Sequence, residues 1–467
     1  MPLHQQLPPL EDVNHTINHG INHFDTHPFS LQFQDPQNHD HTPQFDHSIK
    51  STSACFDPTS PASLELLSMY RSKFKHSRQG FTDEIVTDCA GTLSTLLTAA
   101  ERAGRKQFEI AGKFLIRCGL VASDGGTPVE RLVYYLCDAL QNRIGKETGI
   151  PVPMKPKKIG LKNKNPMAMG TNPTFLACHQ TLPFNQVLQF CGIQAIIDQV
   201  GASSKVHLID IHIRSGVQWT AMMQALIDRK SEITLLKLTA FATSSDVQKV
   251  EETGKRLESF AKTLSLPFLF KILVLSDITE VKEDQFEVQD DEAVAVYCQL
   301  ILRTMISRPQ SLENLMRAIR TINPLVIVVA EVEASHNSTS FVKRFTEALF
   351  FYGAFFDCLE ACMSRDDVHR GIVEGVHLAD GMKDIVAYEG DERVSRSVNI
   401  NTWRLFFTRF EMVEIELSES CMYQANLVLQ QFSCASSCML ESNGKCLLVG
   451  WKGTPLHSLS TWKFDQE

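Results

Sequence analysis

After Pro183 the chain alternates short apolar runs with longer segments of helical periodicity, and this alternation restricts the fold more than any other feature. The first run, Lys205–Ile213, is nearly continuous, as expected for a strand covered on both faces of a sheet. Further strands are predicted over 233–241, 268–275, 324–332 and 412–417, with a closing pair over 445–451 and 458–464. Helices are predicted over 216–229, 246–264, 339–363 and 418–432, with two more filling 290–322. The pattern predicts an α/β fold with a doubly wound, mostly parallel sheet.

The two ends of the chain refine this prediction. A closing strand pair after an alternating run is the arrangement of a class I methyltransferase core, which is Rossmann-like. Residues 61–150 contain no convincing strand but do contain two helical patterns, over 87–104 and 129–144, so they are predicted to form an N-terminal helical cap. Residues 151–182 are predicted to be a basic loop and connector, which leaves the α/β core at 183–467.

Residues 1–60 have a different composition from the rest of the chain. They carry one Lys against seven acidic residues and hold eight of the 16 His, with no apolar periodicity. Such a segment buries too little apolar surface to offset the entropy of ordering, so a disordered, acidic, His- and Pro-rich tail is predicted. His15, His19, His23 and His27 recur every four residues, but Gly20 and the many Asn argue against a stable helix, so we interpret them as adventitious metal ligands.

The whole-chain composition excludes several function classes. A formal net charge of −9 excludes a strongly basic nucleic-acid binder as a description of the whole chain. No apolar run reaches about 18 residues, so no membrane span is predicted. The 13 Cys are scattered without framework spacing and are predicted to be reduced thiols in a cytosolic or nuclear protein.

The turn after the first strand argues against cofactor chemistry. A nucleotide-binding α/β protein needs a Gly-rich turn there, because glycine lets the backbone approach the cofactor. The turn from Asp210 to Gly216 has one Gly, with His212 and Arg214 where bare backbone would be needed. Arg214 is predicted to be a solvated turn residue that could still contact an anion. Neither S-adenosylmethionine nor a dinucleotide is predicted to bind, and no cofactor is assigned.

Two other clusters could carry chemistry but are interpreted as structural. Glu331 and Glu333 fall on one face at the end of a strand and are expected to be salt-bridged structural acids. A loose zinc-like set has wider spacing than a structural zinc site, and buried free thiols are the expected alternative; it comprises Cys434, Cys438, Cys446 and His457. No metal site and no catalytic residue are therefore predicted.

Several ordered blocks resemble the GRAS-domain family of plant transcriptional regulators. The signature block is Val206, His207, Leu208, Ile209 and Asp210, followed by Gly216, Gln218 and Trp219. Further blocks are found over 332–337, 341–361 and 384–396, and a closing block over 448–462 contains Trp451 and Trp462. The resemblance covers about residues 83–467. The chain has no Asp-Glu-Leu-Leu-Ala string, which favours a non-DELLA branch, with a lean toward symbiosis or nodulation signalling.

The resemblance implies a methyltransferase-like core with a helical cap and no methyl transfer. It implies a nuclear, non-enzymatic regulator that dimerises with itself or other GRAS proteins and binds zinc-finger or other DNA-binding transcription factors. DNA contact could be direct or indirect. The alternative is a small-molecule methyltransferase that uses S-adenosylmethionine, and the turn after Asp210 favours the regulator.

Specific roles are predicted for a few residues outside catalysis. Asp210, Gln218 and Trp219 are expected to be structural, because a carboxylate that ends a buried strand needs partners. Lys155, Lys157 and Lys158 form a basic cluster without acids and are a candidate nuclear import signal. Leu93, Leu96 and Leu97 share one helix face and either dock a partner or pack on the cap's own core.

Overall fold

The computed structural model describes residues 83–149, 171–229, 232–276 and 281–465. The tail predicted over 1–60 lies outside these residues, as do Lys155, Lys157 and Lys158. Among the described residues, no helix is both long enough and apolar enough to cross a membrane.

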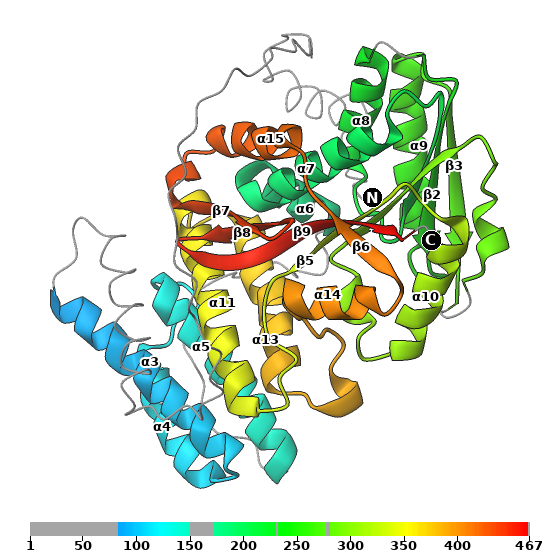
Figure 1. The fold of residues 1–467 in the computed structure, drawn as a ribbon. Coiled ribbons are helices and arrows are strands. Elements are labelled where there is room, and N and C mark those ends of the chain that lie inside the picture. Colours follow the sequence, from blue (N-terminus) through cyan, green and yellow to red (C-terminus); the bar gives the residue numbers. More distant parts are fainter. Residues whose placement is uncertain (1–82, 150–170, 230–231, 277–280, 466–467) are drawn as a thin grey trace, which may run out of the picture.

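In the described part of the chain, one sheet of nine strands forms the centre of the molecule (Figure 1). The strands are β1 (Lys205–Asp210), β2 (Leu235–Ala242), β3 (Phe268–Val274), β4 (Ala293–Gln299), β5 (Val326–Val332), β6 (Met412–Ile415), β7 (Cys438–Asn443), β8 (Cys446–Trp451) and β9 (Thr454–Phe464). Their order is β3-β2-β1-β4-β5-β9-β8-β7, and β6 also pairs with β9. The five strands β1 to β5 are parallel, and β9 joins β5 antiparallel. This confirms the predicted doubly wound, methyltransferase-like sheet.

The prediction of two helices over 290–322 is wrong in its first part, because Ala293–Gln299 is the strand β4. All seven of its residues are buried, with Val294 and Val296 on one face of the sheet and Ala295 and Tyr297 on the other. A strand buried on both faces has no polar alternation, and its Ala residues suit a helix as well, so periodicity alone could not distinguish the two. The short strand β7 was also not predicted.

Helices cover both faces of the sheet. Alternate residues of each central strand enter two different cores: Leu208 of β1 and Val328 of β5 pack on one side, while Ile209 and Val329 pack on the other. The first face is covered by α7 (Pro183–Val200), α8 (Val217–Asp228), α9 (Val247–Thr263) and α15 (Glu419–Gln430). The second face is covered by α10 (Pro309–Ile322) and α14 (Ile400–Thr408). Four short 3-10 turns of the described residues, η3 (Glu283–Phe286), η4 (Leu302–Thr304), η6 (Gly390–Glu392) and η7 (Ala435–Ser437), lie in the connections.

The cap contains more of the chain than the predicted segment 61–150. Its first helices are α3 (Asp83–Gly104), α4 (Phe108–Val121) and α5 (Pro128–Thr148). Against α5 pack α11 (Phe341–Cys362) and α13 (Ala379–Val386), which come from beyond β5. Buried ion pairs join these parts, since Arg131 of α5 contacts Glu360 at 3.0 Å and Glu374 at 3.1 Å. Long-range packing of this kind leaves no local pattern in the sequence.

Short helices close the carboxyl edge of the sheet. The segment 151–182, predicted as loop and connector, ends in the helix α6 (Thr171–Thr181). A continuous helical stretch follows α11, made of α12 (Val368–Ile372) and a π-helical turn, η5 (Val373–Leu378), and it leads into α13. Helix α12 packs against α6.

Candidate functional site

The signature carboxylate, Asp210, is fully buried at the end of β1 and is completely engaged inside the protein. Its Oδ1 accepts a hydrogen bond from the His212 backbone N–H at 3.0 Å. Its Oδ2 accepts one from Trp219 Nε1 at 2.8 Å and a longer one from Gln218 Nε2 at 3.5 Å. Burial raises the pKa of Asp210 to about 6, although the bonds from Trp219 and His212 oppose this rise. These hydrogen bonds hold the end of β1 against the start of α8 and give Asp210 a structural role.

His207, nearer the start of β1, belongs to a second buried polar group. Its Nδ1 lies 3.0 Å from Glu292 Oε2, and its Nε2 lies 2.8 Å from Thr239 Oγ1. Burial, assisted by Lys237, lowers the pKa of His207 to about 3, so the ring is neutral at physiological pH. A neutral ring that donates to Glu292 from Nδ1 can accept the Thr239 hydroxyl at Nε2. The remaining signature residues, Val206, Leu208 and Ile209, are buried apolar side chains of the same strand.

Gly216 is required by helix packing. It precedes α8 with φ at 70°, a left-handed conformation that favours glycine. A Cβ there would lie 2.8 Å from Thr253 Cγ2 and 3.3 Å from Leu257 Cδ1, both on α9. The backbone of the turn is also bound by α9, because Thr253 Oγ1 donates to the Arg214 carbonyl at 3.2 Å. These residues do not fit a cradle for an adenosyl cofactor.

The prediction of a solvated Arg214 is wrong. The side chain is half-buried, and its guanidinium lies 5.4 Å from the centre of the Phe175 ring of α6. That ring in turn stacks on His377 of η5 at 5.4 Å. Burial, with a contribution from Arg303, lowers the pKa of Arg214 to about 10. The helices that cover this edge of the sheet could not be foreseen from the turn itself.

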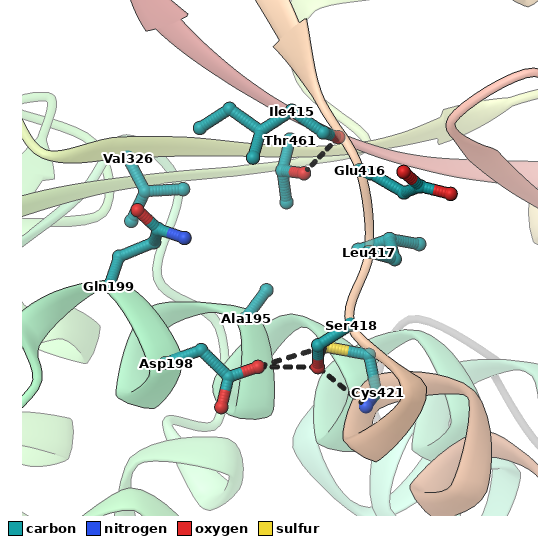
Figure 2. Close-up of a pocket in the computed structure, with 10 residues that line it drawn as sticks. All are labelled: Ala195, Asp198, Gln199, Val326, Ile415, Glu416, Leu417, Ser418, Cys421 and Thr461. Carbon is teal, nitrogen blue, oxygen red and sulfur yellow. Dashed lines mark hydrogen bonds between the residues drawn. The ribbon is translucent and has the colours of Figure 1, made fainter.

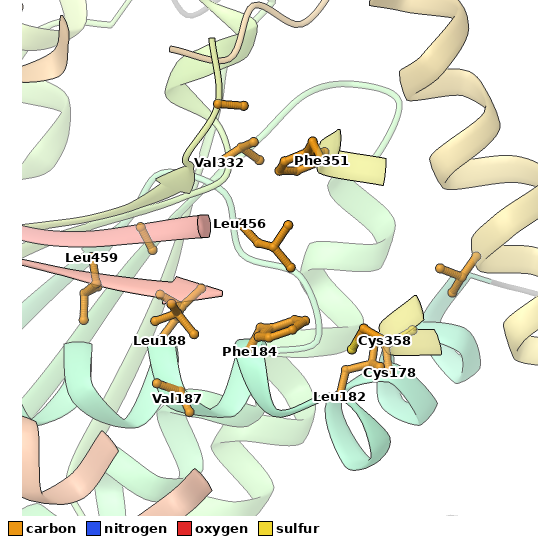
Figure 3. Close-up of a cluster of buried hydrophobic side chains, with 14 of the residues drawn as sticks. Cys178, Leu182, Phe184, Val187, Leu188, Val332, Phe351, Cys358, Leu456 and Leu459 are labelled. Carbon is orange, nitrogen blue, oxygen red and sulfur yellow. The ribbon is translucent and has the colours of Figure 1, made fainter. Parts of the chain in front are cut away.

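Apolar side chains fill the space next to the carboxyl end of β5. Figure 3 shows Leu182, Phe184 and Leu188 gathered with Val332 of β5 and Leu456 of β9. The Phe184 ring lies 5.8 Å from the fully enclosed His457 ring. In doubly wound folds a ligand binds outside the carboxyl ends of the strands. Here this apolar cluster packs helix α7 onto part of that edge.

The two strand-end acids are structural, as expected, but they accept hydrogen bonds from backbone N–H groups and are not held by salt bridges. Glu331 is buried and accepts hydrogen bonds from the backbone N–H groups of Arg303 at 3.2 Å and Val332 at 3.1 Å. Glu333 accepts from the Ile400 N–H at 3.0 Å, at the start of α14. Burial raises the pKa of both carboxyl groups.

The two closing tryptophans are buried anchors. Trp451 Nε1 donates to Asp357 Oδ2 of α11 at 2.6 Å, which joins the end of the sheet to the long helix. Trp462 Nε1 donates to Ser460 Oγ at 2.9 Å, and its ring lies 4.7 Å from that of Phe407.

The structure buries the leucine face proposed for partner docking. Leu93, Leu96 and Leu97 are 6%, 0% and 4% exposed, and all three belong to the main core. This burial is expected if the leucine face packs on the cap's own core. The zinc-like set is spread over the residue before η7 (Ala435–Ser437), β7, β8 and β9, and within the described ranges no three His, Cys, Asp or Glu side chains are placed to bind a metal.

A pocket that the sequence did not indicate lies between α7 and the loop from β6 to α15 (Figure 2). Its cavity volume is about 30 Å³, and it is partly open to solvent. Asp198 Oδ2 accepts a hydrogen bond from Ser418 Oγ at 2.6 Å, and Ser418 Oγ accepts one from the Cys421 N–H at 3.1 Å. These bonds cap α15 and hold it on α7, so the polar groups of the pocket stabilise the fold.

Comparison with known proteins identifies the family. The GRAS domain family model matches residues 92–463, which is most of the chain. The chain belongs to the GRAS domain family. Among its relatives are DELLA protein RGL1 of Arabidopsis thaliana, 28% identical over 79% of this chain and 69% of the relative, and DELLA protein 1 of Medicago truncatula, 28% identical over 80% of this chain and 63% of the relative. The chain thus spans about two thirds of the length of these relatives.

A solved GRAS structure has the same fold. SCL7 of Oryza sativa superimposes with a TM-score of 0.72 at 27% identity, over 80% of this chain and 99% of that one. The match confirms the resemblance carried by the signature block and by the closing block with Trp451 and Trp462. The branch within the family stays a prediction.

Proposed function

We propose that this GRAS protein is a plant transcriptional regulator that acts in the nucleus through contacts with other proteins and does not catalyse a reaction. The observation that carries the proposal is the state of Asp210, whose two oxygens accept internal bonds from His212 and Trp219. An α/β protein that uses this edge for a cofactor keeps such groups available for the ligand. Family membership supports the same function, because the relatives are DELLA proteins.

The partners that the resemblance implies are other GRAS proteins and DNA-binding transcription factors such as zinc-finger proteins, with DNA contacted directly or through them. Helix α4 offers a surface that fits a protein partner. Ile110, Ile116 and Leu120 of this helix are 42%, 50% and 83% exposed. Apolar side chains grouped on an exposed helix are typical of a docking surface, and the side chains at its centre supply most of the binding energy. We propose a second GRAS chain as the occupant.

The experiment is co-purification and promoter occupancy in plant cells. The tagged chain and Leu120→Asp are compared by co-purification with a second GRAS chain and by chromatin immunoprecipitation with and without candidate partners. Leu405→Asp is the matched control, because Leu405 is 74% exposed on a different helix, α14. The proposal expects chromatin occupancy by the native chain, loss of association for Leu120→Asp, and no change for Leu405→Asp. Absence from the nucleus, or occupancy independent of every partner, would contradict it.

A further inference from the structure

Four cysteines from two distant segments of the chain lie together at the end of the sheet. Cys358 and Cys362 occupy successive turns of α11, with their Sγ atoms 3.9 Å apart. Cys434 and Cys438 flank η7, and Cys438 Sγ donates to the Cys434 carbonyl at 3.6 Å. Cys434 neighbours Cys362, whose thiolate contributes to the rise in the Cys434 pKa, so the two pairs form one cluster.

Cys362 is more exposed than most of the other thiols. Of the eleven cysteines whose side chains the structure describes, nine are buried, and Cys362 and Cys438 are the two that are half-buried. Solvent access decides which thiols an oxidant can reach. Both of these half-buried thiols belong to this one cluster.

The surroundings also favour the thiolate of Cys362. Bonds from the thiols of Cys358 and Cys434 stabilise its charge and lower its pKa to about 7, against the opposing effects of burial and Asp357. The Asp357 carboxylate is itself paired with Lys452 at 2.6 Å. Burial raises the pKa of Cys438 to about 11, and it raises the pKa values of Cys358 and Cys434 as well. A thiol with a pKa near the ambient pH reacts fastest, because it combines a large thiolate fraction with good nucleophilicity.

From this clustering and exposure we infer that Cys362 is a site of reversible oxidation by hydrogen peroxide, with Cys434 as the thiol that resolves it to a disulfide. In the first step the Cys362 thiolate attacks one peroxide oxygen, the S–O bond forms, the O–O bond breaks, and hydroxide leaves and takes up a proton as water. In the second step the Cys434 sulfur attacks the Cys362 sulfenic acid. The S–S bond forms, the S–O bond breaks, and the departing hydroxide accepts the Cys434 proton. The two sulfurs are oxidised, and one peroxide is reduced to two waters.

Cys434 suits the resolving role better than Cys358. Cys434 precedes the short turn η7, where the backbone is not held by a long helix, whereas Cys358 lies in the interior of α11 and is completely buried. Part of the rise in the Cys434 pKa comes from the neighbouring Cys362 thiolate. That part disappears once Cys362 becomes a neutral sulfenic acid, so the first step prepares the second.

The disulfide would act on a packing contact that includes a signature residue. Asp357, next to Cys358 in the chain, accepts the Trp451 indole bond. A covalent link between Cys362 and Cys434 would hold the end of α11 against the segment that leads into β7. Oxidation would therefore stiffen the junction between the cap and the end of the sheet.

The test uses the full chain, reduced and then exposed to stoichiometric hydrogen peroxide near neutral pH, with peptide mapping by mass spectrometry. We expect a Cys362–Cys434 disulfide in the native chain and, in Cys434→Ser, a dimedone adduct on Cys362. Cys362→Ser should give neither product. Cys421→Ser is the matched control, because Cys421 also contacts another thiol, Cys191, but is buried; it should behave like the native chain.

The proposal is overturned if oxidation is spread over the thiols without preference for Cys362, if the link joins Cys358 to Cys362, or if zinc that co-purifies with the chain protects all four thiols. A second measurement needs no variant. The rate of Cys362 alkylation by iodoacetamide in the native chain should rise with a midpoint near pH 7, the pKa of that thiol. A midpoint close to the ordinary thiol value of about 8.5 would also overturn the proposal.

Discussion

Trp219 Nε1 and Asp210 Oδ2 lie 2.8 Å apart in the interior, and this bond joins the first strand of the sheet to the helix that follows it. Trp219 is 1% exposed and its ring also meets that of Tyr297 edge-on at 5.2 Å. A buried carboxylate is costly unless it is bonded, so the tryptophan stabilises the fold through both its ring and its N–H. The signature block of this family thus has a structural meaning in this chain.

The first prediction separates these two contributions of Trp219. Trp219→Ala removes the ring and the donor and should lower the free energy of unfolding by about 3–5 kcal/mol, as large core truncations do. Trp219→Phe keeps most of the ring and should cost less, about 1–3 kcal/mol, because one buried acceptor loses its partner. Urea unfolding followed by circular dichroism measures both. A Trp219→Ala chain that keeps its melting temperature but loses partner binding would contradict the structural role.

The positions of most central strands along the chain could be predicted because each is a short apolar run, and such runs follow from burial alone. The exception, β4, shows the limit: its Ala and Val residues are buried on both faces, which erases the alternation that would distinguish strand from helix. The closing strands were predicted as a pair, yet β7 was missed. It lies at the end of the sheet, and none of its residues is fully buried, with Glu441 exposed, so it is not an apolar run.

The second prediction concerns the methyl donor. Titration of S-adenosylmethionine into the full chain by calorimetry should give no binding heat. The reason is that the one glycine of the turn, Gly216, is packed against Thr253 and the Asp210 carboxylate is engaged by Trp219. S-adenosylhomocysteine serves as a second probe of the same edge. A micromolar dissociation constant for either compound would overturn the assignment of a non-enzymatic core.

The third prediction is a pH dependence from His207, whose pKa falls to about 3 in the folded chain. Between pH 6.5 and 3 the unfolded chain binds the proton and the folded chain does not, so stability falls as the pH falls through this window. At pH 5 this one group lowers the free energy of unfolding by about 2 kcal/mol relative to pH 8. In His207→Gln the difference in unfolding free energy between pH 8 and pH 5 should shrink by that amount.

Thr239→Val is the control for this experiment. Thr239 contacts the same ring at 2.8 Å, so the variant removes a hydrogen bond but leaves the titrating group in place. It should be less stable at both pH values and keep the native difference between them. An unchanged difference in His207→Gln would show that the ring does not carry this pH dependence.

The fourth prediction tests the basic cluster of Lys155, Lys157 and Lys158. Replacing all three with Ala in a fluorescent fusion should reduce the nuclear signal, because import receptors bind short Lys clusters. Replacing them with Arg keeps the charge and should leave the distribution unchanged. Equal nuclear signal in the Ala and native fusions would reject an import role and favour a solvated loop.

The candidate site was less predictable than the fold. Asp210 could be assigned a structural role, since a strand that ends in a buried acid needs donors nearby, and Gln218 and Trp219 at the start of the following helix carry N–H donors. The burial of Arg214 could not be predicted, because Phe175 and His377 approach it from α6 and η5, far apart in the chain. Such contacts depend on tertiary packing and leave no spacing to detect. The Cys-x-x-x-Cys spacing of Cys434 and Cys438 is visible in the sequence. The fold is needed to show that a second pair, Cys358 and Cys362 of α11, lies beside it.

The last prediction distinguishes the two interpretations of the leucine face in α3. Leu96 is completely buried, so Leu96→Ala should lower the free energy of unfolding by about 2–5 kcal/mol, and any loss of partner association should follow the loss of folded chain. The comparison is Ile116→Ala on α4, which is half exposed and should change stability by less than about 0.5 kcal/mol while weakening association with a second GRAS chain. Thermal unfolding and co-purification are measured on the same samples. If Leu96→Ala keeps its stability and loses association, the face docks a partner after all and the packing interpretation fails. If it keeps both, the leucine contributes neither to the core nor to binding, which the complete burial of its side chain does not allow.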